Sequence, residues 1–374
     1  MSTSLNLSLA QQRLAQIAQA RQAVLGQGLC GTEVRVDGWF ERSWIERSWL
    51  RCLDAGQRPQ QAVVFAPLGQ RAGPQAQEAS QALLQAARPV LERLGRAIAH
   101  SRYFAILTDA RGVVVDVDGP IDRSDRRARL ITRLGTDLSE AAVGTTAIGA
   151  VLAERRPLWL HRGEHFFDDT SVYSCAGAPL FGPDGDCVGM LDLTGIEAPE
   201  QPELQHLAAQ SARGIENALA LARPHALLLR LGWPGQVLGE DADGLLCVDG
   251  NGQLTAANAA ARELMAALGA PGGVSRLHLS DLFAMPWEML FDAAGREASM
   301  EVPLWSGLTL QVRAQASGAL TVRAAPRRAP MPLRDLEATL IRRAVEDARG
   351  NVAQAAQALG ISRATVYRRL GRKS

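Results

Sequence analysis

Lysine is almost absent from this sequence: of the 40 basic residues only Lys373 is a lysine, and the rest are arginines. A Schiff-base enzyme needs a lysine in its site, and the G-x-x-x-x-G-K-[ST] phosphate loop needs one after a glycine-rich turn. The sequence excludes both. No apolar run reaches the roughly 18 to 20 residues of a membrane-spanning helix, and the N-terminus has no cleavable signal pattern. We therefore expect a cytoplasmic protein without membrane contact.

Cysteines are also few: five are scattered along the chain, an odd number, with no C-x-x-C pair. This pattern indicates neither a disulfide framework nor a cysteine zinc site. Cys175 and Cys187 flank a predicted pair of strands. The sequence therefore leaves open a redox-sensing thiol pair beside the more ordinary outcome of two buried, inert thiols.

The chain has 374 residues, of which 47% are hydrophobic and 21% charged. It is longer than a single core usually reaches, so we expect two to four compact units. Residues 323–374 hold twelve basic and four acidic residues, a net charge of +8, whereas the whole chain carries +1 and the remainder therefore −7. A basic tail on an acidic body suggests a module that binds a polyanion.

Turn signals organise the middle of the chain. The segments 109–112, 183–185 and 249–252 each combine Asp with Gly between β-branched or apolar runs, and each predicts a hairpin. Helical patterns lie between these hairpins, so we predict α+β units built on antiparallel sheets. The first two hairpins fall in a domain at 76–224, and the third falls in a smaller domain at 228–323.

Both ends of the chain are predicted to be helical. Residues 1–75 form an N-terminal helical region whose three tryptophans pack in a core. Residues 324–332, with three prolines and two arginines, form a linker to a helical segment at 333–374. The other elements expected in the smaller domain are a helix at 256–268 and strands at 299–303, 308–314 and 319–322.

The last 40 residues carry the strongest functional signal. A short helix at 352–359 is followed by Gly360, which permits a tight turn, and by Ser362, a good N-cap for a last helix at 363–370. Ala356 allows the two helices to approach closely. This pattern is typical of a helix-turn-helix DNA-binding motif. The alternative is a solvated basic helical hairpin used for oligomerisation.

In a helix-turn-helix, the exposed N-terminal part of the second helix reads base edges and the surrounding basic residues contact phosphates. Operator DNA is therefore the expected macromolecular partner, bound as two half-sites by a homodimer. The predicted DNA-binding residues are Ser362, Arg363, Ala364, Thr365, Tyr367, Arg368, Arg369, Arg372 and Lys373.

Residues 350–370, GNVAQAAQALGISRATVYRRL, closely resemble the Fis-type helix-turn-helix that ends bacterial enhancer-binding transcription activators. The middle of the chain resembles the GAF sensor domain of regulators of acetoin catabolism and dihydroxyacetone-kinase operons. The motifs that carry this resemblance are 140–149, 163–166, 175–179 and 189–195, preceded by a short motif at 48–52, and 244–258 resembles the start of a PAS domain. The resemblance implies a multidomain α+β chain: GAF-like and PAS-like antiparallel-sheet sensor domains, then an all-α Fis-type helix-turn-helix.

One feature departs from that family. Its members carry a large AAA+ ATPase between the sensor and the DNA-binding domain, which remodels the polymerase with the nitrogen-type sigma factor. Here only residues 324–332 occupy that place, and no phosphate loop is present. We expect a regulator that uses no nucleotide or other cofactor. It acts by repression, by recruiting RNA polymerase at ordinary promoters, or by modulating a related full-length regulator.

The resemblance implies that the GAF-like unit holds a small effector. The expected lining of a pocket for a small ketone or alcohol is Trp159, His161, His165, Phe166, Tyr173 and Cys175. The alternative is that these are satisfied core residues and that the domain only dimerises. The PAS-like unit has no evident flavin or haem motif, so we expect a dimerisation or relay role there.

His161, Glu164 and His165 also spell H-x-x-E-H, a zinc-protease pattern. That chemistry needs a continuous helix, whereas residues 158–160 are strand-like and Gly163 follows, so we expect no metal site, no catalytic residues and no enzyme. The expected function is metabolite-controlled, sequence-specific DNA binding that regulates a catabolic operon. The alternative is a protein-interaction adaptor that dimerises with an ATPase-bearing regulator or docks on a metabolic enzyme.

Overall fold

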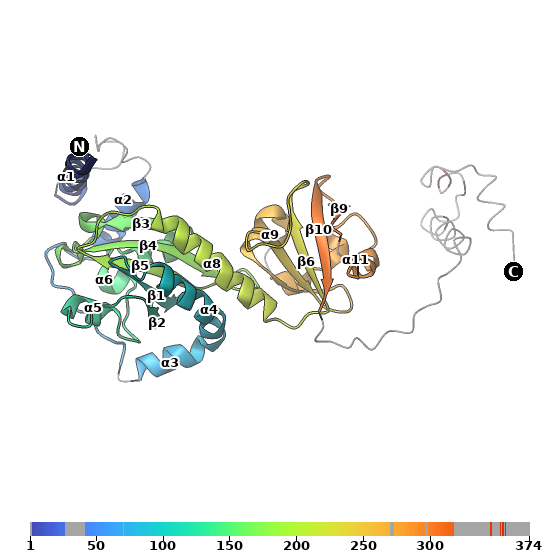
Figure 1. Ribbon diagram of the computed structural model, residues 1–374, viewed down its shortest axis with the longest axis horizontal. Helices are drawn as coiled ribbons and strands as arrows, with labels where there is room; N and C mark the ends of the chain where they lie inside the picture. Colours follow the sequence, from blue (N-terminus) through green and yellow to red (C-terminus); the bar gives the residue numbers. More distant parts are fainter. Residues whose placement is uncertain are drawn as a thin grey trace. The chain divides into compact units, whose positions relative to one another are not determined.

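The computed structural model describes residues 2–26, 42–69, 71–269, 273–295 and 298–317, together with the single residues 345, 352, 354 and 356. The chain forms two compact units, residues 1–320 and 321–374, and the elements given below belong to the first (Figure 1). Within the described ranges, no helix combines the length and apolar character that crossing a bilayer requires.

The first sheet has five antiparallel strands in the order β2-β1-β5-β4-β3. They are β1 (Tyr103–Asp109), β2 (Val114–Asp118), β3 (Leu158–His161), β4 (Tyr173–Phe181) and β5 (Cys187–Ile196). Both hairpins predicted in this region are confirmed. In the first, Oδ1 of Asp109 accepts from the amides of Arg111 and Val113 at 2.9 Å each, and Gly112 takes a φ of +87° that disfavours a side chain.

The two faces of the first sheet are covered by different helices. On one face, here named the α8 face, lie α4 (Gln81–Ala97) and α8 (Leu204–Leu221), which pack on each other (Figure 1). On the opposite α7 face lie α5 (Arg126–Ile131), α6 (Glu140–Val143) and α7 (Ala147–Glu154). Strand alternation assigns side chains to these faces: Ile106 packs in the α7-face core, whereas Leu107 packs in the α8-face core.

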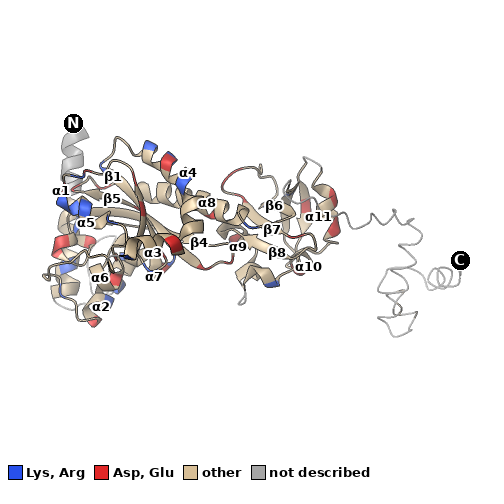
Figure 2. Ribbon diagram, turned by 90° about the horizontal axis from the view of Figure 1, so that it is seen from below, with Lys and Arg blue, Asp and Glu red and all other residues tan. Residues whose placement is uncertain are grey.

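The first two N-terminal helices complete the α7-face core, whereas the third packs in the α8-face core through Ala76. The three helices are α1 (Ser2–Arg21), continued by one turn of π-helix at Gln22–Gly26, then α2 (Ser43–Asp54) and α3 (Ala72–Ala79). Trp44 and Trp49 are buried, as predicted for packing tryptophans, and Val24 joins the same cluster. The third tryptophan of that prediction, Trp39, lies outside the described residues. Charged residues of both signs are spread over the described surface, and three arginines gather on α5 (Figure 2).

The second sheet is also antiparallel and five-stranded, in the order β8-β7-β6-β10-β9. Its strands are β6 (Leu227–Gly232), β7 (Gly244–Val248), β8 (Leu254–Ala257), β9 (Met300–Pro303) and β10 (Thr309–Ala316), and its helices are α9 (Ala259–Leu264), α10 (Leu279–Leu282) and α11 (Glu288–Ala293). The third predicted hairpin is β7–β8, so that prediction is confirmed. Together the two sheets and their helices confirm the α+β class.

Some predicted boundaries in the second sheet are wrong. The helix expected at 256–268 begins only at Ala259, because residues 254–257 pair with β7 and the Asn258 side chain caps α9 by accepting from the Ala261 amide. The strands expected at 299–303 and 308–314 are present as β9 and β10. The strand expected at 319–322, the linker and the helix-turn-helix lie outside the described residues, apart from single positions.

Candidate functional site

The loop between β3 and β4 carries the residues singled out by the H-x-x-E-H pattern. Strand β3 ends at His161, a 3-10 turn follows at Arg162–Glu164, and a second 3-10 turn spans Asp168–Thr170. The turn is tight: Arg162 has a φ of +53°, and the Glu164 carboxylate accepts from the His161 amide at 2.7 Å. The loop therefore presents its side chains in several directions.

A cavity of about 30 Å³ lies on the α7 face of the first sheet. Its lining comes from the sheet, from α5, from the start of α7 and from the β3–β4 loop. The lining residues are Phe65, Ile106, Ile131, Leu138, Thr146, Ala147, Ile148, His165, Thr170, Tyr173, Cys175, Asp192 and Thr194. The cavity is small, so the site suits a small compound rather than a drug-sized one.

Two buried polar atoms on residues that line the cavity have no hydrogen-bond partner within the described part of the chain: Nε2 of His165 and Oδ1 of Asp192. Nδ1 of His165 lies 2.9 Å from the Arg162 carbonyl oxygen, so it carries the proton and leaves Nε2 as an acceptor. Oδ2 of Asp192 accepts from the Thr194 hydroxyl. An unpartnered buried group costs about 1–3 kcal/mol, which a ligand bonded to both atoms would recover.

Burial moves both groups toward their neutral forms. It lowers the pKa of His165 to about 4 and raises the pKa of Asp192 to about 7, although the Thr194 hydroxyl opposes the second shift. At pH 7 the imidazole is therefore neutral, and the carboxyl group is divided between its two forms. A cavity with so little charge suits a neutral ligand.

Three of the six predicted effector residues line this cavity, namely His165, Tyr173 and Cys175. Trp159 and His161 lie on the other face of the sheet: in the register Trp159 is opposite Ala176, and Nδ1 of His161 lies 2.8 Å from the Ser174 hydroxyl. Phe166 is fully buried in the α7-face core, where its ring meets that of Phe167 edge to face. The structure therefore brings together half of the predicted set.

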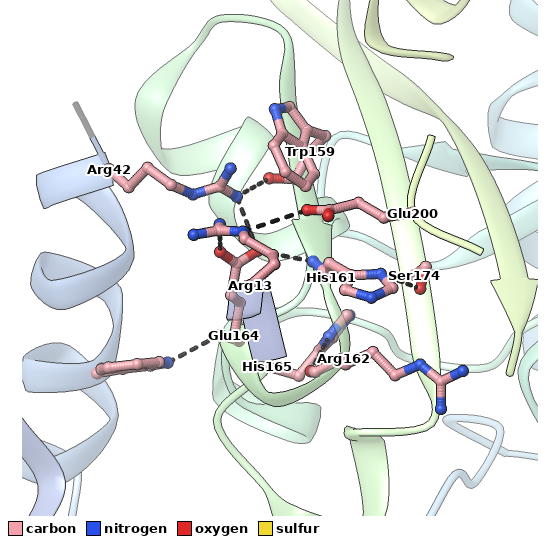
Figure 3. A network of polar contacts seen from close by, with 10 residues as sticks. Arg13, Arg42, Trp159, His161, Arg162, Glu164, His165, Ser174 and Glu200 are labelled. Carbon is pink, nitrogen blue, oxygen red and sulfur yellow. Dashed lines mark hydrogen bonds and ion pairs between the residues drawn. The ribbon is translucent and has the colours of Figure 1, made fainter. Parts of the chain in front are cut away.

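Glu164 is the centre of a separate ion-pair network (Figure 3). Its side chain is fully buried; Oε1 pairs with Arg13, and Oε2 lies 2.7 Å from Nη2 of Arg42. The Arg42 guanidinium lies 3.8 Å from the centre of the Trp159 ring. Burial raises the pKa of Glu164 and lowers that of Arg42, and their mutual attraction opposes both shifts.

The H-x-x-E-H segment does not have the form of a zinc site. It spans the end of a strand and a 3-10 turn, so the expected lack of a continuous helix is confirmed. His161 and His165 point to opposite faces of the sheet, and the carboxylate between them is bound by two arginines. Among the residues that the structure describes, no group of three His, Cys, Asp or Glu is placed to hold a metal ion.

The thiol pair considered as a redox sensor is wrong for this fold. Cys175 is opposite Thr194 in the β4–β5 register, and Cys187 is opposite Phe181. About six residues of strand, roughly 20 Å, separate the two thiols, whereas a disulfide needs Cα atoms within about 7 Å. Burial also raises the pKa of Cys175 well above its usual value, so it remains a thiol.

Sequence reasoning missed Asp192, Thr194 and the arginines of the N-terminal region. A signal for Asp192 and Thr194 was present, because they alternate with Leu191 and Leu193 on an otherwise apolar strand. No local signal marks Arg13 as the partner of a carboxylate about 150 positions away in the chain. All nine predicted DNA-binding residues, Ser362 to Lys373, lie outside the described residues, so their roles stay predictions.

Comparisons with known proteins bear on both parts of the chain. Residues 47–217 match the N-terminal domain of MimR, and residues 332–372 match the Fis family of bacterial regulatory proteins. The acetoin catabolism regulatory protein of Cupriavidus necator is 34% identical over 217 residues, which are 55% of this chain and 31% of that protein. The propane 2-monooxygenase operon transcriptional activator MimR of Mycolicibacterium smegmatis is 31% identical over 141 residues, 37% of this chain and 24% of the activator.

Among solved structures, the crystal structure of the Escherichia coli DhaR(N)–DhaL complex is similar over 72% of this chain and 98% of the compared chain, with 15% identity and a TM-score of 0.45. The chain spans about a third or less of the length of the curated relatives it matches. Those relatives are regulators of catabolic genes. The chain therefore matches a MimR-type N-terminal domain over residues 47–217 and a Fis-family helix-turn-helix over residues 332–372, and it is similar to transcriptional regulators of acetoin catabolism and of propane 2-monooxygenase operons.

Proposed function

We propose that this protein is a regulator of a catabolic operon that binds operator DNA through residues 333–374 and senses a small neutral metabolite in the cavity of the first sheet. One observation carries the sensing role: two unpartnered buried polar atoms, on His165 and Asp192, belong to residues lining one cavity. Residues 76–224 act as the GAF-like sensor, and residues 228–323 act as a PAS-like relay or dimerisation domain.

The chemistry of the cavity selects a ligand class. Nε2 of His165 is an acceptor and needs a donor such as a hydroxyl group. Asp192 accepts from a second hydroxyl when ionised and donates to a carbonyl oxygen when protonated. The remaining lining is mostly apolar, with Ile106 and Ile148 among its members. A short hydroxyketone or diol satisfies both polar atoms and fills the rest with carbon.

The DNA-binding part follows from the predicted helix-turn-helix. Arg363 and Thr365, at the start of its second helix, read base edges, whereas Arg372 and Lys373 contact phosphates. A homodimer places two such helices on half-sites about one helical turn apart. Output needs no ATPase: the regulator represses, recruits RNA polymerase, or modulates a related regulator.

The test measures affinity of the purified protein for its own upstream DNA, with and without acetoin or dihydroxyacetone, at two salt concentrations. We expect sequence-specific binding that weakens as salt rises and that one of these compounds alters. Arg363→Ala should relax specificity at a cost of about 1–3 kcal/mol, whereas Arg372→Ala should weaken all DNA equally. Binding that ignores sequence, or a regulatory effect that survives deletion of 333–374, would favour the adaptor instead.

A further inference from the structure

The β3–β4 loop has two sides, and only one of them faces the cavity. His165, whose buried Nε2 has no hydrogen-bond partner among the described residues, is one of the residues that line the cavity. The carbonyl groups of Gly163, His165 and Phe166 are bound instead by the N-terminal helix. The position of the acceptor atom in the cavity therefore depends on what holds these carbonyl groups.

Arg21, the last residue of α1, holds them with a single guanidinium group. Nη1 donates to the carbonyl oxygens of His165 at 2.6 Å and Gly163 at 3.3 Å. Nη2 donates to the carbonyl oxygen of Phe166 at 2.6 Å and to the carboxylate of Asp168 at 2.6 Å. Four acceptors within six residues match the rigid fork of arginine, and a lysine ammonium cannot reproduce that geometry.

Two further arginines hold the same loop through Glu164. Arg13, also on α1, pairs with Glu164 and lies 3.3 Å from Oε1 of Glu200 (Figure 3). Arg42 joins Glu164 to the carbonyl oxygen of Trp159 at 2.8 Å. The ends of α1 and α2 are therefore bonded to the segment that positions His165.

Apolar packing ties the helix to the same place. Ala20 and Val24 are fully buried in one cluster with Phe166, Tyr173 and Cys175. Ile17 is also buried and passes close to the loop, because its Cγ2 lies 3.3 Å from where a Cβ on Gly163 would stand. Movement of the cavity wall and movement of α1 are thus not independent.

We propose that Arg21 is a positioning residue of the effector site: it sets the direction of His165 Nε2, so that docking of α1 and occupation of the cavity stabilise each other. The inference rests on the proposed sensing function and adds the N-terminal helix to the site. Coupling of this kind is reciprocal, so a ligand bonded to His165 also tightens the helix.

The test uses the full chain with Arg21→Gln, Arg21→Lys and the control Arg111→Gln, which removes an exposed arginine paired with nearby Asp109. Hydrogen exchange is followed at 163–168 and at 187–196. Arg21→Gln should speed exchange at 163–168 about tenfold, the equivalent of about one net hydrogen bond. Exchange at 187–196 should stay unchanged, and the control should alter neither segment.

Two readouts separate positioning from structural support. In ¹⁵N-histidine spectra the wild type should show His165 only as the Nδ1–H tautomer, whereas Arg21→Gln should show a mixture, assigned with His165→Gln. With acetoin as the probe, Arg21→Gln should weaken binding about tenfold and Arg21→Lys about threefold, since lysine keeps the charge but not the fork. Arg111→Gln should bind as the wild type does.

Wild-type exchange at 163–168 and a wild-type tautomer in Arg21→Gln would overturn the proposal whatever acetoin does. If acetoin, dihydroxyacetone and 2,3-butanediol all fail to bind the wild type, the proposed ligand class fails, and exchange and tautomer still decide the role of Arg21. Faster exchange at 187–196 as well would show that Arg21→Gln unfolds the protein. In that case exchange at 163–168 and the His165 tautomer are measured in Arg21→Lys instead. If Arg21→Lys shows the same exchange and the same His165 tautomer as the wild type, Arg21 has a structural role only and the proposal fails.

Discussion

The two sheets of the first unit have the same number of antiparallel strands but different cores. The core of the second sheet is an apolar cluster that includes Leu246, Phe283 and Val312. The buried polar residues described in that part of the chain are Asp243 and Asn258, near the start of α9. The first sheet instead buries many polar groups, and two of them, His165 and Asp192, keep an atom without a partner on residues that line one cavity. In the second sheet Oγ1 of Thr255, on β8, also lacks a partner among the described residues, but Thr255 does not line that cavity.

The difference indicates where the chain keeps buried polar groups that lower the stability of the fold and therefore serve a role such as ligand binding. A buried polar atom without a partner lowers stability, whereas an apolar side chain of similar size does not. In the second sheet Asn258 bonds four groups and acts as a helix cap, which is a structural role. The first sheet is therefore the better candidate for ligand binding, and the second for a relay or dimerisation role.

The largest effect should come from Glu164→Gln. The change leaves Arg13 and Arg42 beside a neutral amide, and removing one partner of a buried ion pair costs about 3–5 kcal/mol. Urea unfolding followed by tryptophan fluorescence measures the loss. Glu301→Gln, at an exposed position of the second sheet, is the control and should change stability little. A loss for Glu164→Gln below about 1 kcal/mol would contradict the assigned network.

Asp192→Asn should stabilise the protein, but only at higher pH. The folded-state pKa of Asp192 is about 7 against a usual 3.8, so the folded state holds the extra proton between these values and stability falls as pH rises through that window. Relative to the wild type, the free energy of unfolding of Asp192→Asn should be higher by about 2–4 kcal/mol at pH 8 and unchanged near pH 4. Thermal unfolding at both pH values tests this, and an equal gain at the two would sink it.

A second buried acidic group, Glu216, also makes the stability of the folded protein fall as pH rises, so Asp192→Asn should remove only part of this pH dependence. Burial also raises the pKa of Glu216 to about 7, so the variant should retain part of the downward slope. His161 and His165, with pKa values lowered to about 4, act in the opposite sense, because stability is lost as pH falls from about 6.5 toward 4.

Asn258→Ala tests the structural role assigned to the polar group of the second sheet. It removes the cap of α9 and leaves the Leu245 amide and the Asp243 carbonyl without this partner, at a cost of about 1–3 kcal/mol. Affinity for acetoin should be unchanged. Asn258→Asp keeps the oxygen that accepts the cap hydrogen bond, so it should lower the free energy of unfolding by less than Asn258→Ala does. A change in acetoin affinity with Asn258→Ala would break the division between the two sheets.

The smallest effect should come from Arg223→Gln, which removes an exposed ion pair with Asp184 at 2.6 Å. Both side chains are more than a third exposed, so the pair should contribute less than about 1 kcal/mol and less still at high salt. Urea unfolding at two salt concentrations measures it. A loss comparable to that of Glu164→Gln would show that burial does not decide how much an ion pair contributes to the stability of this protein.

Local features of the fold were predictable because their causes are local. The turn at 109–112 follows from an Asp that caps its own hairpin and a Gly that takes a left-handed conformation. The helix expected at 256–268 was misplaced, because alanine-rich composition favours a helix but pairing with β7 outweighs it at 254–257. Tertiary context overrides a propensity of a few tenths of a kcal/mol per residue.

The candidate site was predictable only in part. The prediction grouped Trp159 and His161 with Tyr173 and Cys175, but the β3–β4 register sets Trp159 opposite Ala176 and His161 opposite Ser174, on the other face of the sheet, and register is not readable from the sequence. Asp192 stood out as a charged residue in an apolar strand and could have been found. The arginines of α1 and α2 could not, since no short-range pattern links them to the β3–β4 loop.

The sequence alone determined the class of the protein: turn chemistry predicts two antiparallel α+β regions, and the basic tail with its glycine turn predicts a helix-turn-helix, now matched to the Fis family. Only the tertiary structure decided which polar groups meet in a cavity and that Arg13, Arg21 and Arg42 brace one loop. The reason is physical. Turns and caps are satisfied by neighbours in the chain, whereas a buried charge or an unpartnered acceptor is defined by every segment packed around it.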